Sequence, residues 1–194
     1  MTARRVTGLV LAGGRSSRFG RDKLEERFDG RTLLVNAIDG VTPASTEILV
    51  VAAPDATPSI PRRATLIHDP VAFDGPLAGV AAGLRAARES IVVIVGGDMP
   101  TLVGAVIESI LVQLDVPGVD AVVLDHDGRP RPLPMALRRE PALAAAESLL
   151  ADGERRLRAL IDALDARVIQ EATWRALDPY GMTVRDVDTP ADLG

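Results

Sequence analysis

Short runs of Val, Ile, Leu and Ala recur along the chain, separated by segments in which apolar residues have a helical spacing. Continuous runs of this length are typical of strands covered on both faces, and they occupy residues 6–11, 48–53, 64–67, 91–95 and 119–124. The helices that we expect span residues 32–39, 77–88, 102–114, 141–151 and 154–164. This alternation predicts an α/β fold: a single Rossmann-like three-layer domain in which helices cover both faces of a mostly parallel central sheet. We expect residues 1–194 to form this one domain, because no linker or internal repeat divides them.

Turn residues mark two further boundaries. Asp127-Gly128 predicts the tip of a hairpin that leads from the run at 119–124 into a strand at 131–137. Asp152-Gly153 indicates the end of one helix before the next begins. Residues 168–182 have a mixed pattern, and there the sequence favours no single element.

The first apolar run ends in two glycines, within Leu11-Ala12-Gly13-Gly14. A glycine loop after a strand lets backbone N–H groups face a ligand without obstruction by side chains. Four cations follow within ten residues of Gly13, namely Arg15, Arg18, Arg21 and Lys23. This pattern predicts a loop that holds a polyphosphate, and the alternative is an ordinary glycine-rich turn with surface arginines.

The commoner phosphate loops do not match this stretch. A Walker loop requires Lys followed by Ser or Thr directly after its last glycine, whereas Gly20 is followed by Arg21-Asp22-Lys23. The dinucleotide fingerprint also fails, because Arg15 stands where its second glycine would be. The loop therefore indicates another kind of nucleotide site.

Charge and composition narrow the class of ligand. Lys and Arg number 22 against 27 Asp and Glu, and the resulting net charge of −5 disfavours a general binder of polyanions. Aromatic residues make up 3% of the chain, too few for the stacking platforms that bind single-stranded nucleic acid. We therefore expect no nucleic-acid partner, and the local group of cations suits a compact phosphate site.

Cysteine is absent, which excludes disulfides, thiolate metal sites and a cysteine nucleophile. The first apolar run is too short for the core of a signal peptide, and no apolar stretch approaches the length of a membrane span. We expect a cytoplasmic protein with no membrane partner.

A carboxylate follows the fourth apolar run, in Gly96-Gly97-Asp98-Met99-Pro100. Ligands of α/β sheets bind beyond the carboxyl ends of the strands, where Asp98 and the Gly13-Gly14 loop would converge. Mg²⁺ prefers one or two carboxylates together with phosphate oxygens and water, and Asp98 is our candidate for the first carboxylate. The alternative is that Asp98 caps a helix beginning near Thr101.

Three stretches occur in the order found in one family: Leu11-Ala12-Gly13-Gly14 with Arg18-Phe19-Gly20-Arg21-Asp22-Lys23, then Asp74-Gly75-Pro76-Leu77-Ala78-Gly79, then residues 96–100. Together they resemble the motifs of the nucleotidyltransferase family that includes molybdenum cofactor guanylyltransferase. The resemblance extends to residues 153–156 and to Asp186-Val187-Asp188-Thr189-Pro190, so that it covers nearly the whole chain. It implies a Mg²⁺-dependent transfer of GMP from GTP to the phosphate of molybdopterin or its molybdenum form, with release of pyrophosphate.

The resemblance also implies roles for individual residues on the nucleotide side. Leu11, Ala12, Gly13 and Gly14 would bind the nucleotide, and Gly13 is the form that accompanies guanine, since a residue without Cβ lets a purine approach the backbone. Lys23 and Arg18 would offset the charge on the departing pyrophosphate, and Asp98 would bind the metal and the nucleotide. Asp69 would hold the ribose or base, and its alternative is the start of an Asp-Pro loop.

For the acceptor, the resemblance implies Gly75 and Gly79 at the start of a helix, together with Asp186 and Asp188. The two aspartates replace asparagines that are common among guanylyltransferases, and they look more like the cytidylyltransferases. A carboxylate there would bind a second metal or face the acceptor phosphate; the alternative is a turn before a short helix capped at Thr189.

Some residues weaken the match or carry no role. Ala52 stands where a nucleotide-contacting asparagine is often found, and residues 153–156 are either acceptor-binding cations or a solvated helix start. His68 and His126 lack the spacing of metal ligands, and we expect Trp174 and Tyr180 to be packing residues.

Other functions stay open at this point. A relative with the same chemistry could use another base or acceptor, as do molybdopterin cytidylyltransferase, phospholactate guanylyltransferase and the sugar-phosphate nucleotidyltransferases. A nucleotide-binding module without turnover is less favoured, because it has less need of Lys23 and Asp98. The expected partners are GTP, molybdopterin and, in transient contacts, molybdoenzymes or other proteins of cofactor biosynthesis.

Overall fold

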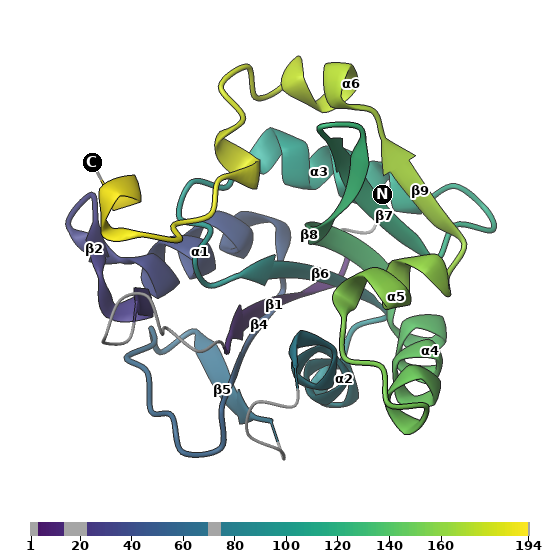
Figure 1. The fold of residues 1–194 in the computed structure, drawn as a ribbon, viewed down its shortest axis with the longest axis horizontal. Coiled ribbons are helices and arrows are strands. Elements are labelled where there is room, and N and C mark those ends of the chain that lie inside the picture. Colours follow the sequence, from purple (N-terminus) through teal and green to yellow (C-terminus); the bar gives the residue numbers. More distant parts are fainter. Residues whose placement is uncertain (1–3, 14–22, 70–74, 194) are drawn as a thin grey trace.

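The computed structural model describes residues 4–13, 23–69 and 75–193 (Figure 1). In this part of the chain, seven strands form one sheet in the order β5-β4-β1-β6-β8-β7-β9. The strands are β1 (Val6–Ala12), β4 (Glu47–Ala52), β5 (Ala64–His68), β6 (Ile91–Gly96), β7 (Ala121–His126), β8 (Arg129–Arg138) and β9 (Ala166–Ile169). A separate two-stranded ribbon consists of β2 (Arg27–Phe28) and β3 (Arg31–Thr32).

Strand direction confirms the mostly parallel sheet that the sequence predicts. β1 pairs in parallel with β4 and β6, so that Leu9 lies beside Leu49 and Ile94, and β5 continues in parallel beyond β4. Among the described strands of this sheet only β8 is antiparallel, pairing with β6 on one side and β7 on the other. The carboxyl ends of β5, β4, β1 and β6 therefore meet at one edge of the sheet.

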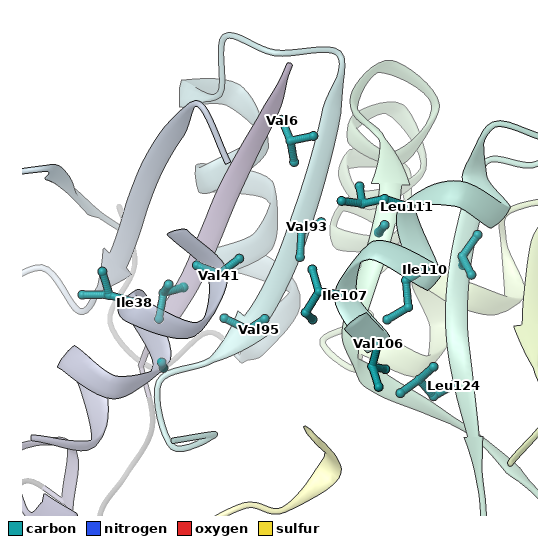
Figure 2. Packing of buried hydrophobic residues seen from close by; sticks show 14 of the residues in the cluster. Val6, Ile38, Val41, Val93, Val95, Val106, Ile107, Ile110, Leu111 and Leu124 are labelled. Atoms are coloured by element: carbon teal, nitrogen blue, oxygen red, sulfur yellow. The ribbon is translucent and has the colours of Figure 1, made fainter. Parts of the chain in front are cut away.

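Helices lie on both faces, as expected from the doubly buried strands. One face carries α1 (Leu33–Val41), α3 (Gly104–Leu114) and α6 (Glu171–Arg175), and the other carries α2 (Pro76–Ala86), α4 (Arg139–Ala151) and α5 (Leu157–Asp162). Side chains of β1 point alternately to the two faces of the sheet and so contribute to a hydrophobic core on each face. Val6 and Val10 face the first group of helices, and Leu9 faces the second. Figure 2 shows the first core between β1, β6, α1 and α3, including Val6, Val93, Val95, Ile38, Val41, Ile107 and Ile110.

The predicted elements are present, with shifted ends where side chains intervene. α3 begins at Gly104 rather than 102, because the N–H of Val103 donates to Thr183 Oγ1 at 3.1 Å and holds the preceding residues outside the helix. α5 begins at Leu157 rather than 154, because the Glu154 carboxylate accepts bonds from the N–H groups of Arg155 and Arg156. The hairpin is confirmed, and Asp127 and Gly128 at its tip both have positive φ.

The mixed stretch at 168–182 contains the end of β9, the short α6 and the start of a 3₁₀ turn, η3 (Met182–Val184). Trp174 is fully buried and its indole N–H donates to the Asp125 carbonyl at 2.7 Å, which confirms its packing role. The same prediction is wrong for Tyr180, which is 87% exposed in the turn that follows α6. In the described ranges, no helix combines the length and the apolar character that a membrane crossing requires.

Candidate functional site

Polar residues gather at the edge where the parallel strands end. Asp69 directly follows β5, Gly13 follows β1, and Asp98 comes two residues after β6. The antiparallel β8 reaches the same edge from the opposite direction, because Ile94 near the end of β6 pairs with Met135. Residues of β8 that precede Met135, Arg131 among them, therefore run beyond the carboxyl end of β6.

The turn after β6 is shaped around the Asp98 side chain. A Cβ added to Gly96 would lie 2.5 Å from Asp98 Oδ1 and 3.3 Å from Met99 Cγ, so this glycine leaves the space that the carboxylate occupies. The N–H of Gly97 donates to the Leu11 carbonyl at 2.9 Å and ties the turn to β1. In the sequence Gly96 belongs to a motif, but nothing local indicates that it makes room for a side chain two residues away.

Lys23 lies in the 3₁₀ turn η1 (Lys23–Glu25), and its ammonium contacts three oxygen groups of the described residues. Lys23 Nζ donates to Asp98 Oδ2 at 2.7 Å, to the Val187 carbonyl at 3.1 Å and to Asp188 Oδ1 at 3.4 Å. The side chains of Lys23, Asp98 and Asp188 are 19%, 27% and 60% exposed, so the group opens to solvent on the side of Asp188. The fold thus brings together residues that the sequence separates by 75 and 165 positions.

The charge state of this group follows from its surroundings. Burial by itself lowers the pKa of Lys23, but the hydrogen bond and charge of Asp98, with help from Asp188, outweigh it and raise the pKa above its usual value. Lys23 is therefore a cation held between two carboxylates and a carbonyl. Oxygen donors of these kinds are the ones that Mg²⁺ and Ca²⁺ prefer, so Asp98 and Asp188 are suited to hold a hard metal ion.

The segment that carries Asp186 and Asp188 is hydrogen-bonded to the turn after β6. The N–H of Val187 donates to the Asp98 carbonyl at 3.0 Å, and the Val187 side chain is fully buried. Asp186 and Asp188 flank this anchor but contact different cations. Asp186 Oδ2 accepts from Arg131 at 2.5 Å, whereas Asp188 faces Lys23.

Burial raises the pKa of Asp186 above its usual value; Arg131 opposes the shift, and the nearby charges of Asp98 and Asp188 add to it. Arg131 also donates from Nε to the Leu133 carbonyl at 3.0 Å. Sequence reasoning missed Arg131, because an arginine within a strand gives no local sign that a carboxylate 55 residues away will meet it.

The buried side chain of Asp178, which is 3% exposed, holds the chain that precedes Asp186 in place. Its carboxylate accepts from the N–H groups of Met182 at 3.0 Å and Thr183 at 2.7 Å. Burial raises the pKa of Asp178, but these backbone bonds outweigh it and hold the pKa below its usual value. Thr101 Oγ1 donates to the Met182 carbonyl at 2.7 Å and so joins η3 to the residues before α3. This bond fixes where the chain begins that leads from η3 to Asp186.

Two of the alternative interpretations can now be decided. The cap interpretation of Asp98 is wrong, because α3 begins at Gly104 with Val103 at its N-cap and no side-chain cap bond. The turn before a short C-terminal helix is also present, because η4 (Pro190–Leu193) begins directly after Thr189. Asp192 Oδ2 accepts from the N–H and the hydroxyl of Thr189, at 2.7 and 2.9 Å, as the third residue of a helix does toward the residue at its N-cap.

On the nucleotide side, the structure describes Leu11, Ala12, Gly13 and Asp69, while Gly14 and Arg18 lie outside the described residues. Asp69 is 9% exposed, and its N–H donates to the Ala52 carbonyl at 2.9 Å. A Cβ on Gly13 would meet none of the described atoms within 4 Å, so packing against the described residues does not require a glycine there.

The two glycines assigned to the acceptor differ in their surroundings. A Cβ on Gly79 would lie 3.8 Å from Asp69 Oδ2 and 3.9 Å from Leu11 Cδ2, at ordinary contact distances. Gly75 has φ of 90°, and a Cβ there would lie 2.9 Å from Arg155 Cβ, so backbone conformation and close packing both require it. An acceptor-binding role for either glycine stays a prediction.

The neighbouring residues 153–156 match the solvated interpretation in part. Arg156 Nη2 pairs with Glu154 Oε2 at 2.7 Å, and the Arg156 side chain is mostly exposed. Hydrogen bonds from the Arg156 side chain and from the backbone N–H groups of Arg156 and Arg155 lower the pKa of Glu154 to about 2.

His126 was given no role from its spacing, but the fold places it beside two carboxylates. Its Nδ1 lies 3.5 Å from Glu171 Oε1 and its Nε2 lies 3.8 Å from Asp127 Oδ2. Glu171 Oε1 already accepts two bonds from Arg175, and Glu171 Oε2 accepts from the Asp127 N–H at 3.1 Å. Because a guanidinium already supplies the positive charge, we interpret this group as the contact between the hairpin tip and α6.

Comparison with known proteins finds relatives that are named as molybdenum cofactor guanylyltransferases. A family model described as the MobA-like NTP transferase domain matches residues 8–168. The "Probable molybdenum cofactor guanylyltransferase" of Chloroflexus aggregans is 35% identical over 195 residues, which covers 97% of this chain and 91% of that protein. The molybdenum cofactor guanylyltransferase of Burkholderia ambifaria is 38% identical over 167 residues, covering 79% of this chain and 80% of that one.

Among solved structures, molybdopterin-guanine dinucleotide biosynthesis protein A from Archaeoglobus fulgidus superposes with a TM-score of 0.80 at 23% identity, covering 96% of this chain and 94% of that one. The 4-diphosphocytidyl-2C-methyl-D-erythritol synthase of Anaerococcus prevotii gives 0.71 at 15% identity, covering 98% and 95%. At these identities the likeness concerns the fold alone, and it extends over essentially all of both chains.

Proposed function

We propose that this chain, which belongs to the MobA-like NTP transferase family, is a guanylyltransferase that joins GMP from GTP to the phosphate of molybdopterin or its molybdenum form. The names of relatives that match nearly the whole chain support the substrates. The observation that carries the chemistry is the meeting of Lys23, Asp98 and Asp188 at the carboxyl end of β6.

In this reaction an oxygen of the acceptor phosphate forms a bond to the α-phosphorus of GTP, and the bond from that phosphorus to the bridging oxygen breaks. The electron pair leaves with pyrophosphate, so the protein need supply no covalent nucleophile. Positioning and charge stabilisation dominate phosphoryl transfers, and we extend this principle to the transfer of a nucleotidyl group.

Asp98 and Asp188 would hold the Mg²⁺, whose role is to neutralise charge on the triphosphate. Lys23 is protonated and adjoins these carboxylates, so it can offer its N–H groups to the oxygens of the leaving pyrophosphate. The buried Asp69 at the end of β5 supports a nucleotide that lies across the ends of β1, β4 and β5, as does Gly13, where a Cβ would meet no described atom within 4 Å. Arg18 keeps its predicted role beside Lys23.

The acceptor then belongs on the side of Asp186, Asp188 and the start of α2, where Gly75 was predicted to contribute. Both aspartates adjoin the end of β6, as a phosphate aligned with the α-phosphorus requires. The cytoplasmic location and the transient contacts with molybdoenzymes remain predictions.

A pyrophosphate-release assay with each of the four nucleoside triphosphates tests the proposal, run without an acceptor and with molybdopterin, phospholactate or a sugar phosphate. We expect release with GTP and Mg²⁺ that depends on molybdopterin. Release with CTP instead would indicate a cytidylyltransferase, and release only with phospholactate or a sugar phosphate would indicate another acceptor. GTP binding without turnover under any of these conditions would leave a nucleotide-binding module.

A further inference from the structure

The two aspartates of the C-terminal segment are separated by the single residue Val187, and their sequence context does not distinguish them. In the structure they face different partners. Asp188 Oδ1 points toward the Lys23 ammonium beside Asp98, and Asp186 Oδ2 is bonded to the Arg131 guanidinium at 2.5 Å. Both aspartates lie near Asp98, because the intervening Val187 N–H is bonded to the Asp98 carbonyl.

Arg131 is held firmly enough to direct Asp186. It lies on β8, whose register against β6 and β7 places it at the carboxyl edge of the sheet. Its Nε donates to the Leu133 carbonyl at 3.0 Å while Nη2 donates to Asp186, so the planar guanidinium is fixed by two bonds in different directions. Both side chains are partly buried, with 23% and 33% of their surfaces exposed, so solvent screens the pair less than it would a fully exposed one.

A third carboxylate this close to Asp98 and Asp188 has a consequence for cation binding. An aspartate with a free carboxylate beside two candidate ligands would join them or attract a second divalent cation, since both raise the number of oxygen donors. A carboxylate engaged by a guanidinium that is itself held in place is a poorer ligand, because its oxygen and its charge are both occupied. Asp98 and Asp188 differ, because in the proposed function the Lys23 ammonium that they share turns to the phosphate oxygens when the nucleotide binds.

We propose that Arg131 is a positioning residue that holds Asp186 out of the cation site, so that Asp98 and Asp188 are the carboxylates that the described residues supply to it. This inference rests on the proposed function, in which those two residues hold the divalent ion. It gives the two neighbouring aspartates separate tasks and assigns a role to an arginine on the antiparallel strand.

A Mn²⁺ titration of the full chain tests the proposal without an activity measurement. The loss of the free-ion signal in electron paramagnetic resonance measures the bound Mn²⁺. Asp188→Asn should weaken Mn²⁺ binding at least about tenfold, whereas Asp186→Asn should change it less than about threefold. Arg131→Gln should tighten it by about threefold, or add a second bound ion, because Asp186 is released. The double variant Arg131→Gln/Asp186→Asn should return to the behaviour of Asp186→Asn.

Equal weakening by Asp186→Asn and Asp188→Asn would show that Asp186 is itself a ligand and would overturn the proposal. Unchanged Mn²⁺ binding in Arg131→Gln would also overturn it, while leaving the proposed function intact. Circular dichroism of each variant verifies folding, and if Arg131→Gln does not fold, the comparison of the two aspartate variants still decides. A wild-type protein that binds no Mn²⁺ even with GTP would remove the metal site, and both proposals with it.

Discussion

Replacing Asp98 by asparagine separates a catalytic role from a structural one. The substitution keeps the size of the side chain, and the Asp98 carbonyl that accepts from Val187 N–H is untouched. What changes is the negative charge 2.7 Å from the Lys23 ammonium, in a pair whose side chains are 19% and 27% exposed. The substitution therefore tests the charge of Asp98 and little else.

The two expected effects differ in size. A partly exposed ion pair contributes no more than about 1 kcal/mol to folding, which corresponds to a fall in Tm of at most about 4 °C for a chain of this length. The loss in turnover should be at least about a hundredfold, roughly 2.7 kcal/mol on the transition state, because an amide replaces a charged ligand of the divalent ion. Catalysis should therefore collapse in a protein that remains folded.

The assay measures Mg²⁺-dependent pyrophosphate release beside thermal unfolding, for wild type and Asp98→Asn. Asp162→Asn is the matched control, since it removes a charge from an exposed position at the end of α5. We expect the control to retain wild-type turnover. Near-normal turnover in Asp98→Asn would refute the reasoning and would remove Asp98 from the site.

Three further predictions follow from the same geometry. Lys23→Ala should lower kcat more than it raises KM in steady-state kinetics, because the ammonium stabilises charge that grows on the leaving group, and a rise confined to KM would contradict this role. Gly13→Ala should leave Tm unchanged but weaken GTP binding at least about tenfold in calorimetry, since the added Cβ meets no described protein atom and lies where we propose that the base approaches the backbone; unaltered affinity would argue against a base at this loop. Asp178→Ala should lower the free energy of unfolding by about 2 kcal/mol at neutral pH, because the buried N–H of Thr183 and the partly buried N–H of Met182 lose their acceptor. Since the pKa of Asp178 is depressed in the folded state, its contribution is complete above the unfolded pKa of about 3.9 and disappears as pH falls through the folded value, so denaturant titrations should show the gap closing in acid.

Local patterns in the chain were sufficient to predict the architecture. Continuous apolar runs indicated strands buried on both faces, and the hairpin at Asp127-Gly128 followed from residues that tolerate positive φ. The glycine loop after β1 and the carboxylate after β6 were predicted to share one edge, since parallel strands end together. Lys23 and Asp98 do meet there, although 75 residues separate them.

The tasks of Asp186 and Asp188 were decided only by the tertiary structure. The sequence presents two aspartates in one short motif, and nothing local distinguishes them. The register of antiparallel β8 on β6 brings Arg131 to one of them, and Lys23 in η1 lies beside the other. The requirement for glycine at position 96 was also decided by the tertiary structure, because the Asp98 carboxylate occupies the space that a Cβ would need. The spacing of apolar residues indicates which side of a helix or strand is buried. Which side chains meet across long sequence separations depends instead on how whole helices and strands align with one another.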